Sequence, residues 1–167
     1  TSRRWENLRI INIVADGTIV KEGDFLVQFD TTNALREVTD RQNELEQAKA
    51  ELASTKASIE SGMKQLENQF KSQQYDFESN KLSYELAKFE ADIKRREMEL
   101  QFKKSELSLE QAKQKIESQK IIDKASIGRS ELRVKQSETR LNEAQTALAG
   151  LTINAPKSGL VVLREIF

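Results

Sequence analysis

Apolar residues between Leu35 and Tyr84 recur in steps of three and four, which is the spacing of a heptad repeat. One seam position carries Val38, Leu45, Leu52, Ile59 and Leu66, and the other carries Leu35, Gln42, Lys49, Lys56, Met63, Phe70, Phe77 and Tyr84. Residues at two such positions lie on one stripe of a helix, as in a coiled coil. Gly62 falls inside the register without shifting it, at a cost of roughly 1 kcal/mol relative to alanine. The pattern predicts a continuous helix over this stretch.

The heptad pattern continues in two further runs. The second run is offset by two residues from the first and carries Leu82, Leu86, Phe89, Ile93, Leu100 and Leu107. The third run carries Ile127, Val134, Leu141 and Leu148 at intervals of seven residues. Lys and Glu fill most of the intervening positions, so the outer faces of these helices are expected to be soluble.

Two places compete for the point at which the helix reverses direction. The midpoint of the helical stretch is near Ala91, beside the offset between the first two runs, and a reversal there leaves two arms of similar length. Each arm would hold about 55 residues and be about 80 Å long. Residues 122–130 contain weaker helix formers and Gly128, but a reversal there leaves a last arm far too short to pair with the rest. We therefore predict a hairpin tip near residues 82–94, with residues 122–130 as the alternative.

Both ends of the chain have the period of strands instead of helices. Near the start, Phe25, Val27 and Phe29 alternate with more polar neighbours, after turn signals at Asp16-Gly17 and Glu22-Gly23-Asp24. Near the end, an alternating pattern begins at Leu151, and Pro156 and Gly159 mark a turn before a second apolar run. Each segment alone would expose an apolar face that it could not bury.

These observations predict an α+β fold, in which a long antiparallel α-helical coiled-coil hairpin is inserted into a small split β-domain. Residues 1–31 form the first half of that domain, residues 32–150 the hairpin, and residues 151–167 the second half. Residues near Val27 are expected to pair with residues near Val161. A structural coiled coil without a transport role is an alternative, but it leaves the two glycine-punctuated β segments unexplained.

Composition excludes several classes of function. The chain has 27 Lys+Arg and 27 Asp+Glu, so it has no basic surface for nucleic acid. His and Cys are absent, which removes the commonest general base, the commonest metal ligand and all disulfides. Glu44 and Glu46, like Glu97 and Glu99, lie two residues apart and so face different sides of a helix. We predict no catalytic, cofactor-binding or metal-binding residue, and no enzyme activity.

The polarity of the chain favours an extended, solvated coiled coil. The mean hydropathy is −0.65 and hydrophobic residues make up 37%, which is too polar for one large globular core. The sequence contains no run of about 18 apolar residues, so it predicts no membrane-spanning segment.

The two β segments carry short motifs whose order around the hairpin is more specific than either motif alone. The first has the form Asp-Gly-x-x-Val-Lys-x-Gly-Asp-x-Leu-x-x-Phe-Asp and the second the form Ile-x-Ala-Pro-x-x-Gly-x-Val. The matching residues are Asp16, Gly17, Val20, Lys21, Gly23, Asp24, Leu26, Phe29, Asp30, Ile153, Ala155, Pro156, Gly159 and Val161. Over nearly its whole length the chain thus resembles the hemolysin-D-type (HlyD) membrane fusion proteins, the periplasmic adaptors of bacterial efflux pumps and type I secretion systems.

This resemblance implies a partner set and a location. It implies a lipoyl-like β-domain without lipoate and without any other cofactor. It implies a periplasmic protein that is anchored to the inner membrane by a segment outside residues 1–167. Such a protein bridges an inner-membrane transporter and an outer-membrane channel. The ABC type is one candidate for the transporter, and the hairpin tip is expected to contact the channel. It also implies self-association, with six copies around a conduit.

Two short motifs bear on this resemblance: a channel-docking motif that is incomplete here, and a lipoylation motif that matches but lies in a stretch predicted to be helical. Adaptors that dock on TolC-like channels often have an Arg, a Leu four residues on and a Ser seven further at the tip. Around residues 124–132 the end of that motif is matched, but Glu117 and Ile121 stand where Arg and Leu would be needed. Asp123-Lys124-Ala125 matches the site of lipoylated carriers, yet it sits in helix-period sequence far from both β segments. A biotinyl or lipoyl carrier domain is therefore the weaker alternative.

Overall fold

A computed structural model describes residues 9–164 of the chain; residues 1–8 and 165–167 of the two β segments lie outside the described residues. The structure divides into two compact units, which we describe in turn. The first unit comprises Thr1–Lys49 and Arg133–Phe167, and the second comprises Ala50–Leu132. Among the described residues, neither long helix has an apolar stretch of sufficient length to cross a membrane.

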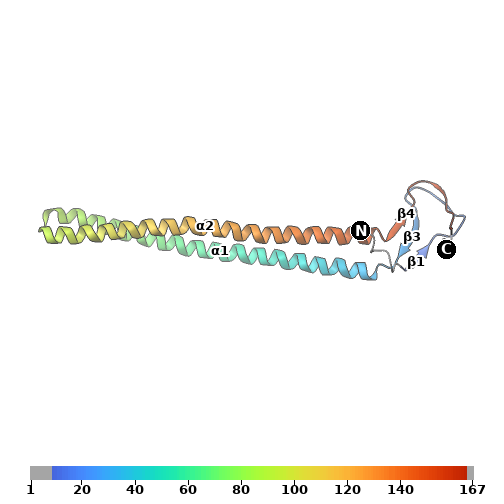
Figure 1. Ribbon diagram of the computed structural model, residues 1–167, viewed down its shortest axis with the longest axis horizontal. Coiled ribbons are helices and arrows are strands. Elements are labelled where there is room, and N and C mark those ends of the chain that lie inside the picture. Colours follow the sequence, from blue (N-terminus) through green and yellow to red (C-terminus); the bar gives the residue numbers. More distant parts are fainter. Residues whose placement is uncertain (1–8, 165–167) are drawn as a thin grey trace. The chain divides into compact units, whose positions relative to one another are not determined.

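Two long antiparallel helices make up most of the chain (Figure 1). Helix α1 spans Thr32–Leu86, a 3₁₀ turn η1 spans Ala87–Phe89, and helix α2 spans Asp92–Ala149. The chain reverses between Leu86 and Asp92, within the interval 82–94. Residues 122–130 lie inside α2, so no reversal occurs at the alternative position.

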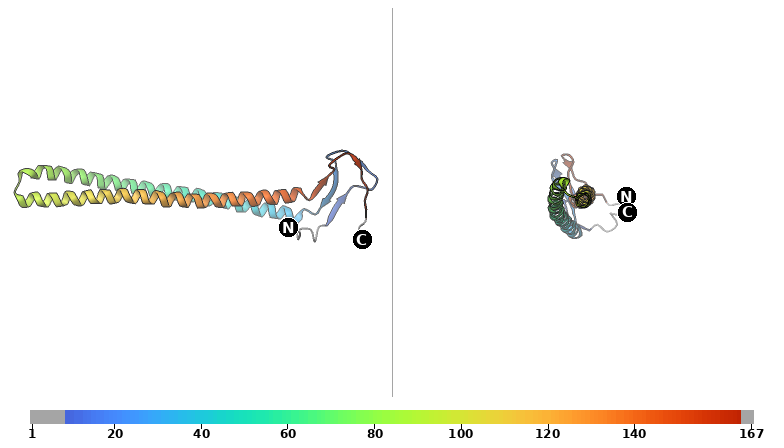
Figure 2. Two further views of the ribbon diagram at one scale, coloured as in Figure 1. Left: turned by 45° about the horizontal axis from the view of Figure 1, so that its top comes forward. Right: turned by 90° about the vertical axis from the view of Figure 1, so that its left-hand side faces the viewer.

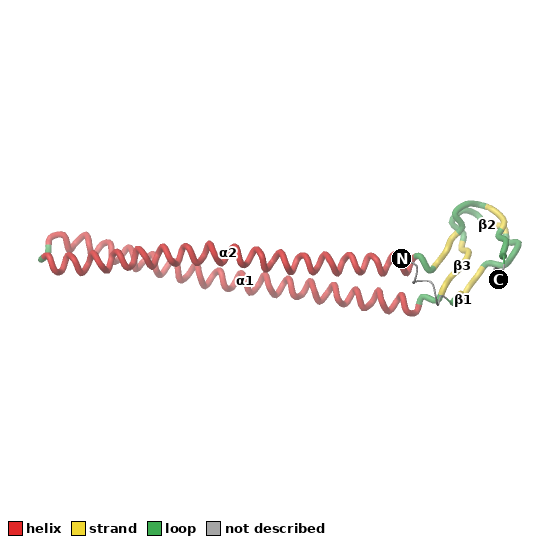
Figure 3. The backbone as a smooth tube through the Cα atoms, in the orientation of Figure 1, coloured by secondary structure: helices red, strands yellow, loops and turns green. Residues whose placement is uncertain are grey.

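Residues 9–164 form five short strands, all in the first unit, and the strands are drawn in yellow in Figure 3. They are β1 (Ile10–Ile13), β2 (Ile19–Val20), β3 (Phe25–Phe29), β4 (Thr152–Asn154) and β5 (Gly159–Leu160). The strands β1, β3 and β4 form one antiparallel sheet in that order, and β2 pairs with β5 in a second. Each sheet joins strands from both ends of the sequence. The predicted fold class, a helical hairpin inserted into a small split β region, is therefore confirmed.

The pairing partner of Val27 differs from the expected one. Val27 lies opposite Ile153 in the β3–β4 ladder. Val161 instead directly follows β5 of the other sheet. Its backbone N–H donates to the carbonyl of Thr18 (2.9 Å), and its carbonyl accepts from Gly17 (2.9 Å). The turn that follows Ala155 carries the chain from one sheet to the other, which moves Val161 away from β3. Val27 and Val161 nevertheless line the same apolar cavity.

A glycine turn ties the two β segments together. Gly23 has a φ of +89°, a conformation that costs little only for glycine. Its N–H donates to the carbonyl of Ala155 (2.8 Å), and the N–H of Ala155 donates to the carbonyl of Asp24 (2.7 Å). Ala155 is buried between these bonds. The turn signal seen in the sequence thus makes direct contact with the opposite end of the chain.

The seam of α1 follows one predicted position from Val38 to Leu66, and the other predicted position only from Met63 onward. Val38, Leu45, Leu52, Ile59 and Leu66 are buried or half-buried, as predicted. Leu35, Gln42, Lys49 and Lys56 are exposed, and their neighbours Ala34, Arg41, Ala48 and Thr55 are buried or half-buried instead. Ala34, Ala48 and Thr55 are small, so a search for large apolar residues does not detect them. Small side chains nevertheless allow two helices to approach closely. After Leu66 a step of four brings the seam onto Phe70, Phe77 and Tyr84.

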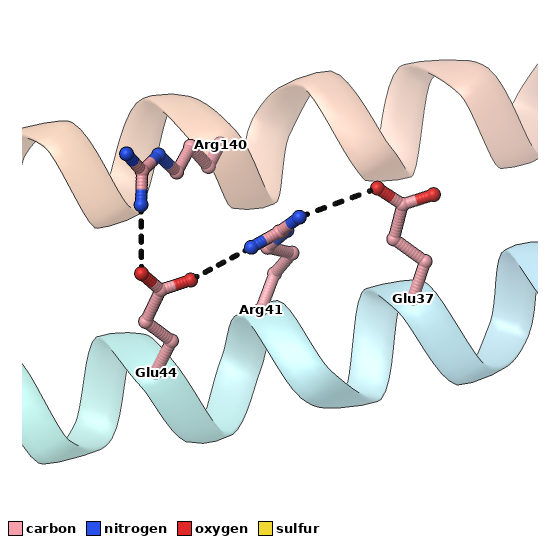
Figure 4. A network of polar contacts seen from close by, with 4 residues as sticks. All are labelled: Glu37, Arg41, Glu44 and Arg140. Carbon is pink, nitrogen blue, oxygen red and sulfur yellow. Dashed lines mark hydrogen bonds and ion pairs between the residues drawn. The ribbon is translucent and has the colours of Figure 1, made fainter.

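An ion-pair network joins α1 and α2 within the first unit (Figure 4). One carboxylate oxygen of Glu44 accepts a hydrogen bond from Arg140 of α2 (2.8 Å), and the other accepts from Arg41 of α1 (3.0 Å). Glu37 lies 3.7 Å from the Arg41 guanidinium. The hydrogen bond from Arg41, and the charge of Arg140 after it, hold the pKa of Glu44 below its usual value. The side chains are part-exposed, so the network orients the helices more than it stabilises them.

Glu44→Gln should lower stability at neutral pH and have little effect in acid. A carboxylate whose pKa is lowered by folding contributes stability above its ordinary pKa, and the contribution is lost as the pH falls through the lowered value. The difference in Tm between Glu44→Gln and the unsubstituted chain should therefore shrink between pH 7 and about pH 3. Thermal unfolding followed by circular dichroism tests this, with the exposed Glu143→Gln as the control. A difference that is equal at both pH values would contradict the assignment.

Candidate functional surface at the hairpin tip

The tip of the hairpin is a tight reversal built without glycine or proline. After α1, the 3₁₀ turn closes with a hydrogen bond from the N–H of Glu90 to the carbonyl of Ala87 (3.0 Å). Glu90 is extended, with φ −103° and ψ 176°, which turns the chain toward α2. Asp92 in the first turn of α2 pairs with Arg95 (2.7 Å), and its negative charge is favourable at a helix N-terminus. The reversal is therefore held by backbone and local ionic contacts.

A layer of aromatic rings from α1 and α2 lies next to the tip. The ring of Phe102 on α2 stacks on Tyr84 with a centroid distance of 5.6 Å and contacts Phe77 at 5.3 Å. The ammonium group of Lys88 lies 5.9 Å from the centre of the Tyr84 ring, within the range of a cation–π contact. Ala87, the first residue of the 3₁₀ turn, is buried. These contacts join α1 to α2 immediately before the reversal.

Large apolar side chains point outward at the tip. Phe89 is 94% exposed and Ile93 is 85% exposed. More than half of the surface is also exposed in Leu82, Leu86, Leu100 and Leu107. These six residues are the second heptad run, and its assignment to the hairpin seam is wrong. The run forms an outer apolar surface instead.

The third heptad run, Ile127, Val134, Leu141 and Leu148, is half-buried, as its spacing predicts. Between the tip and that run, the seam of α2 follows a series that the sequence reasoning missed. Its buried and half-buried members are Met98, Phe102, Ser105, Leu109, Ala112, Ile116 and Gln119. Phe102, Leu109 and Ile116 recur every seven residues just as Leu100 and Leu107 do, so two competing stripes were present in the sequence. Ser105 and Ala112 alternate with Phe102, Leu109 and Ile116 along the buried stripe. These small residues could have identified that stripe in the sequence, because small side chains allow the two helix backbones to approach closely.

Little in the described part of the chain suggests chemistry. Across residues 9–164, no group of three or more His, Cys, Asp or Glu is placed to hold a metal ion. Lys124 of the Asp123-Lys124-Ala125 motif lies in the middle of α2 and lines an open groove with Ile59 and Met63 of α1. That is a helical position, whereas the lysine of a lipoylated carrier requires a tight β-turn. The described residues of the hairpin offer exposed surfaces for contact with other molecules.

Comparison with solved structures shows what fold the chain has. MacA from Actinobacillus actinomycetemcomitans is similar with a TM-score of 0.63 and 21% sequence identity, over 97% of this chain and 41% of that chain. The periplasmic adaptor protein EmrA has a TM-score of 0.46 at 19% identity, over 95% of this chain and 64% of that one. The soluble domain of LipC, a membrane fusion protein of a type I secretion system, has a TM-score of 0.49 at 16% identity, over 96% and 90%.

No protein-family model and no curated protein sequence matches the chain. The likeness to MacA establishes a shared fold, and it confirms the fold expected from the resemblance to the hemolysin-D-type membrane fusion proteins. The chain spans less than half the length of MacA.

Proposed function

We propose that the chain is the hairpin and split β-domain of a periplasmic adaptor, which links an inner-membrane transporter to an outer-membrane channel during efflux or secretion. The observation that carries the proposal is the exposed apolar tip on a fold shared with MacA. The adaptor acts by assembly and contact, without a catalytic step of its own. Its anchor to the inner membrane lies in a segment outside these residues.

The tip is the surface proposed to meet the channel. Phe89 and Ile93 project from the reversal with most of their surface in water, where a side chain of that size has no packing role within the chain. Exposed aromatic residues at the centre of a small patch are typical of positions that dominate binding energy. The aromatic layer of Phe77, Tyr84 and Phe102 gives this patch a rigid base, so contact does not require ordering of a loop.

The transporter end of the proposed bridge is assigned to the β unit and the regions that adjoin it. Several apolar residues of this unit are exposed, among them Ile19, Leu160 and Val162, which suits packing against further domains. We propose an inner-membrane transporter as the partner at this end, with the ABC type as one candidate. Several copies, six in the resembling family, would act together around a conduit.

Phe89→Glu should abolish export while leaving the fold intact. The side chain makes almost no contact within the chain, so the substitution should not alter helicity. A charge in the centre of an apolar contact carries the desolvation cost of that charge, and we expect export to fall by about tenfold or more. Export by cells carrying the intact protein, together with circular dichroism of the purified variant, measures both effects.

Asn68→Glu is the matched control, because Asn68 is an exposed residue of α1, 21 residues before Phe89 and away from the tip. It should leave both export and helicity unchanged. Export that survives charged and bulky substitutions throughout residues 82–94 would show that the tip does not contact the channel. A loss of helicity in Phe89→Glu would instead show that the side chain has a structural role.

A further inference from the structure

The second unit contains two glycines in the interiors of its long helices, Gly62 in α1 and Gly128 in α2. Neither has a positive φ, and a Cβ atom built at either position would meet nothing within 4 Å. Alanine would therefore fit at both places without strain. Because glycine weakens a helix interior relative to alanine, both residues lower helix stability and give no packing advantage within the chain.

The two glycines border adjoining hollows in the groove between the helices. Gly62 lines a hollow of about 330 Å³ together with Ile59 of α1 and Asp123 of α2. Gly128 lines a second hollow, of about 420 Å³, which Ile59 and Asp123 also border. Protein interiors are normally filled to the density of organic crystals, so the two helices pack loosely at this level.

The polar side chains at this level bond within one helix. Asp123 is half-buried in the seam of α2, and its carboxylate accepts a hydrogen bond from the amide of Gln119 one turn away (2.8 Å). On α1, Gly62 directly follows Ser61, and glycine–serine pairs are among the few common causes of kinks in helices. The side chains here therefore hold α2 to itself more than they hold it to α1.

The spacing of the seam changes in the same stretch of the hairpin. Half-buried positions of α1 step from Gly62 by four residues to Leu66 and by four again to Phe70, where a heptad repeat would alternate three and four. On α2 a double step of four begins at Ser126 and ends at Val134. Such an insertion is a stutter, which locally unwinds a coiled coil. The winding of the two helices about each other is therefore relaxed in the stretch that contains the glycines.

We infer that residues 59–66 of α1 and residues 119–128 of α2 form a joint, at which both helices open locally and the hairpin bends. The glycines, the adjoining hollows, the polar seam and the stutters coincide there. Local opening costs least where helix propensity and apolar packing are both weak.

The joint lets the tip side of the second unit tilt as one piece against the rest of that unit. Toward the tip, Phe102 of α2 contacts Phe77 and Tyr84 of α1, and these ring contacts hold the helices together while the joint opens. The inference goes beyond the proposed function, because it concerns a motion of the hairpin itself, whatever partner the tip meets.

Hydrogen exchange of the full-length protein, followed by mass spectrometry, tests the local opening. The rates are corrected for the intrinsic exchange of each residue type. We expect amides of the joint to exchange at least about tenfold faster than amides of residues 74–84 and 98–109, which surround the aromatic layer. Equal protection of the joint and the aromatic layer would overturn the inference.

Gly62→Ala should slow exchange in residues 59–66 by about fivefold, because alanine strengthens the helix. Gly128→Ala should act in the same way on residues 119–128. Both variants should fold, since a Cβ atom at either position meets nothing. Ser72→Ala is the matched control, because Ser72 is an exposed residue of α1 outside the joint, and it should leave exchange in the joint unchanged.

Spin labels measure the bending, because residues 1–167 contain no cysteine. Labels are attached to Ser54→Cys and Ser72→Cys, which are exposed on either side of the joint in α1, in a background without other cysteines. The control pair is Arg96→Cys and Gln114→Cys, exposed residues of α2 with the same separation in sequence and no part of the joint between them. We expect the distance distribution across the joint to be wider than that of the control pair, and Gly62→Ala to narrow it.

Distributions of equal width would overturn the inference, and so would a wide distribution and fast exchange that both alanine substitutions leave unchanged. If those variants lose export without a change in exchange or width, the glycines serve close contact with another molecule and the joint is wrong. If exchange and width change as expected while Phe89→Glu still exports, the joint stands and the proposed tip function fails.

Discussion

Cysteines in place of Val27 and Ile153 should form a disulfide within one chain and stabilise it by about 2–4 kcal/mol. The two residues are partners in the β3–β4 ladder, although they come from opposite ends of the sequence. The bond would close a loop that contains the whole hairpin, and a loop of that length greatly restricts the unfolded chain. Denaturant unfolding under oxidising and reducing conditions measures the gain.

The pair Val27→Cys and Val161→Cys is the matched control. Val161 lines the same cavity as Val27, but its backbone is hydrogen-bonded to Gly17 and Thr18 in the other sheet. It should therefore form the intramolecular bond slowly or with strain, and stabilise less. If both pairs give only bonds between different chains, the two β segments do not form one unit.

Leu45→Ala should destabilise the first unit by roughly 2–3 kcal/mol, near the lower end of the range for buried leucine. Leu45 is only 6% exposed and lies beside the buried Ala48, where α1 packs on α2. The cost stays below that of a globular core because the groove between two helices remains open to water on both sides. Chemical denaturation followed by circular dichroism provides the measurement.

Leu35→Ala is an unusually direct control, because it is the same substitution in the same helix. Leu35 is 52% exposed, so its loss should cost less than about 0.5 kcal/mol. The heptad pattern alone placed both leucines in the seam and predicts similar costs. Equal costs would therefore support the sequence register and contradict the structural one.

The first unit pairs strands from the two β segments and contains the Glu44–Arg140 contact between the helices, whereas the second unit exposes large apolar side chains at the tip, among them Phe89 and Ile93. Substitutions in the first should affect stability, and substitutions in the second should affect assembly or export.

The sequence by itself determined the elements and their order. Long runs of heptad spacing predict helices. The two end segments, with alternating apolar residues and glycines at the turns, predict strands, and neither segment can bury its apolar face without the other. The midpoint argument located the reversal because two helices of unequal length cannot cover each other's apolar faces. Composition alone also showed that the chain has no histidine and no cysteine.

Only the tertiary structure decided which apolar stripe faces inward. Leu100 and Leu107 compete with Phe102 and Leu109 on equal terms in the sequence, because both series repeat every seven residues. The choice depends on the aromatic contacts of Phe102 with Phe77 and Tyr84 across the hairpin, which join residues far apart in the chain. Periodicity defines a stripe on one helix, but the contact between two helices selects the stripe that is buried and leaves the other exposed.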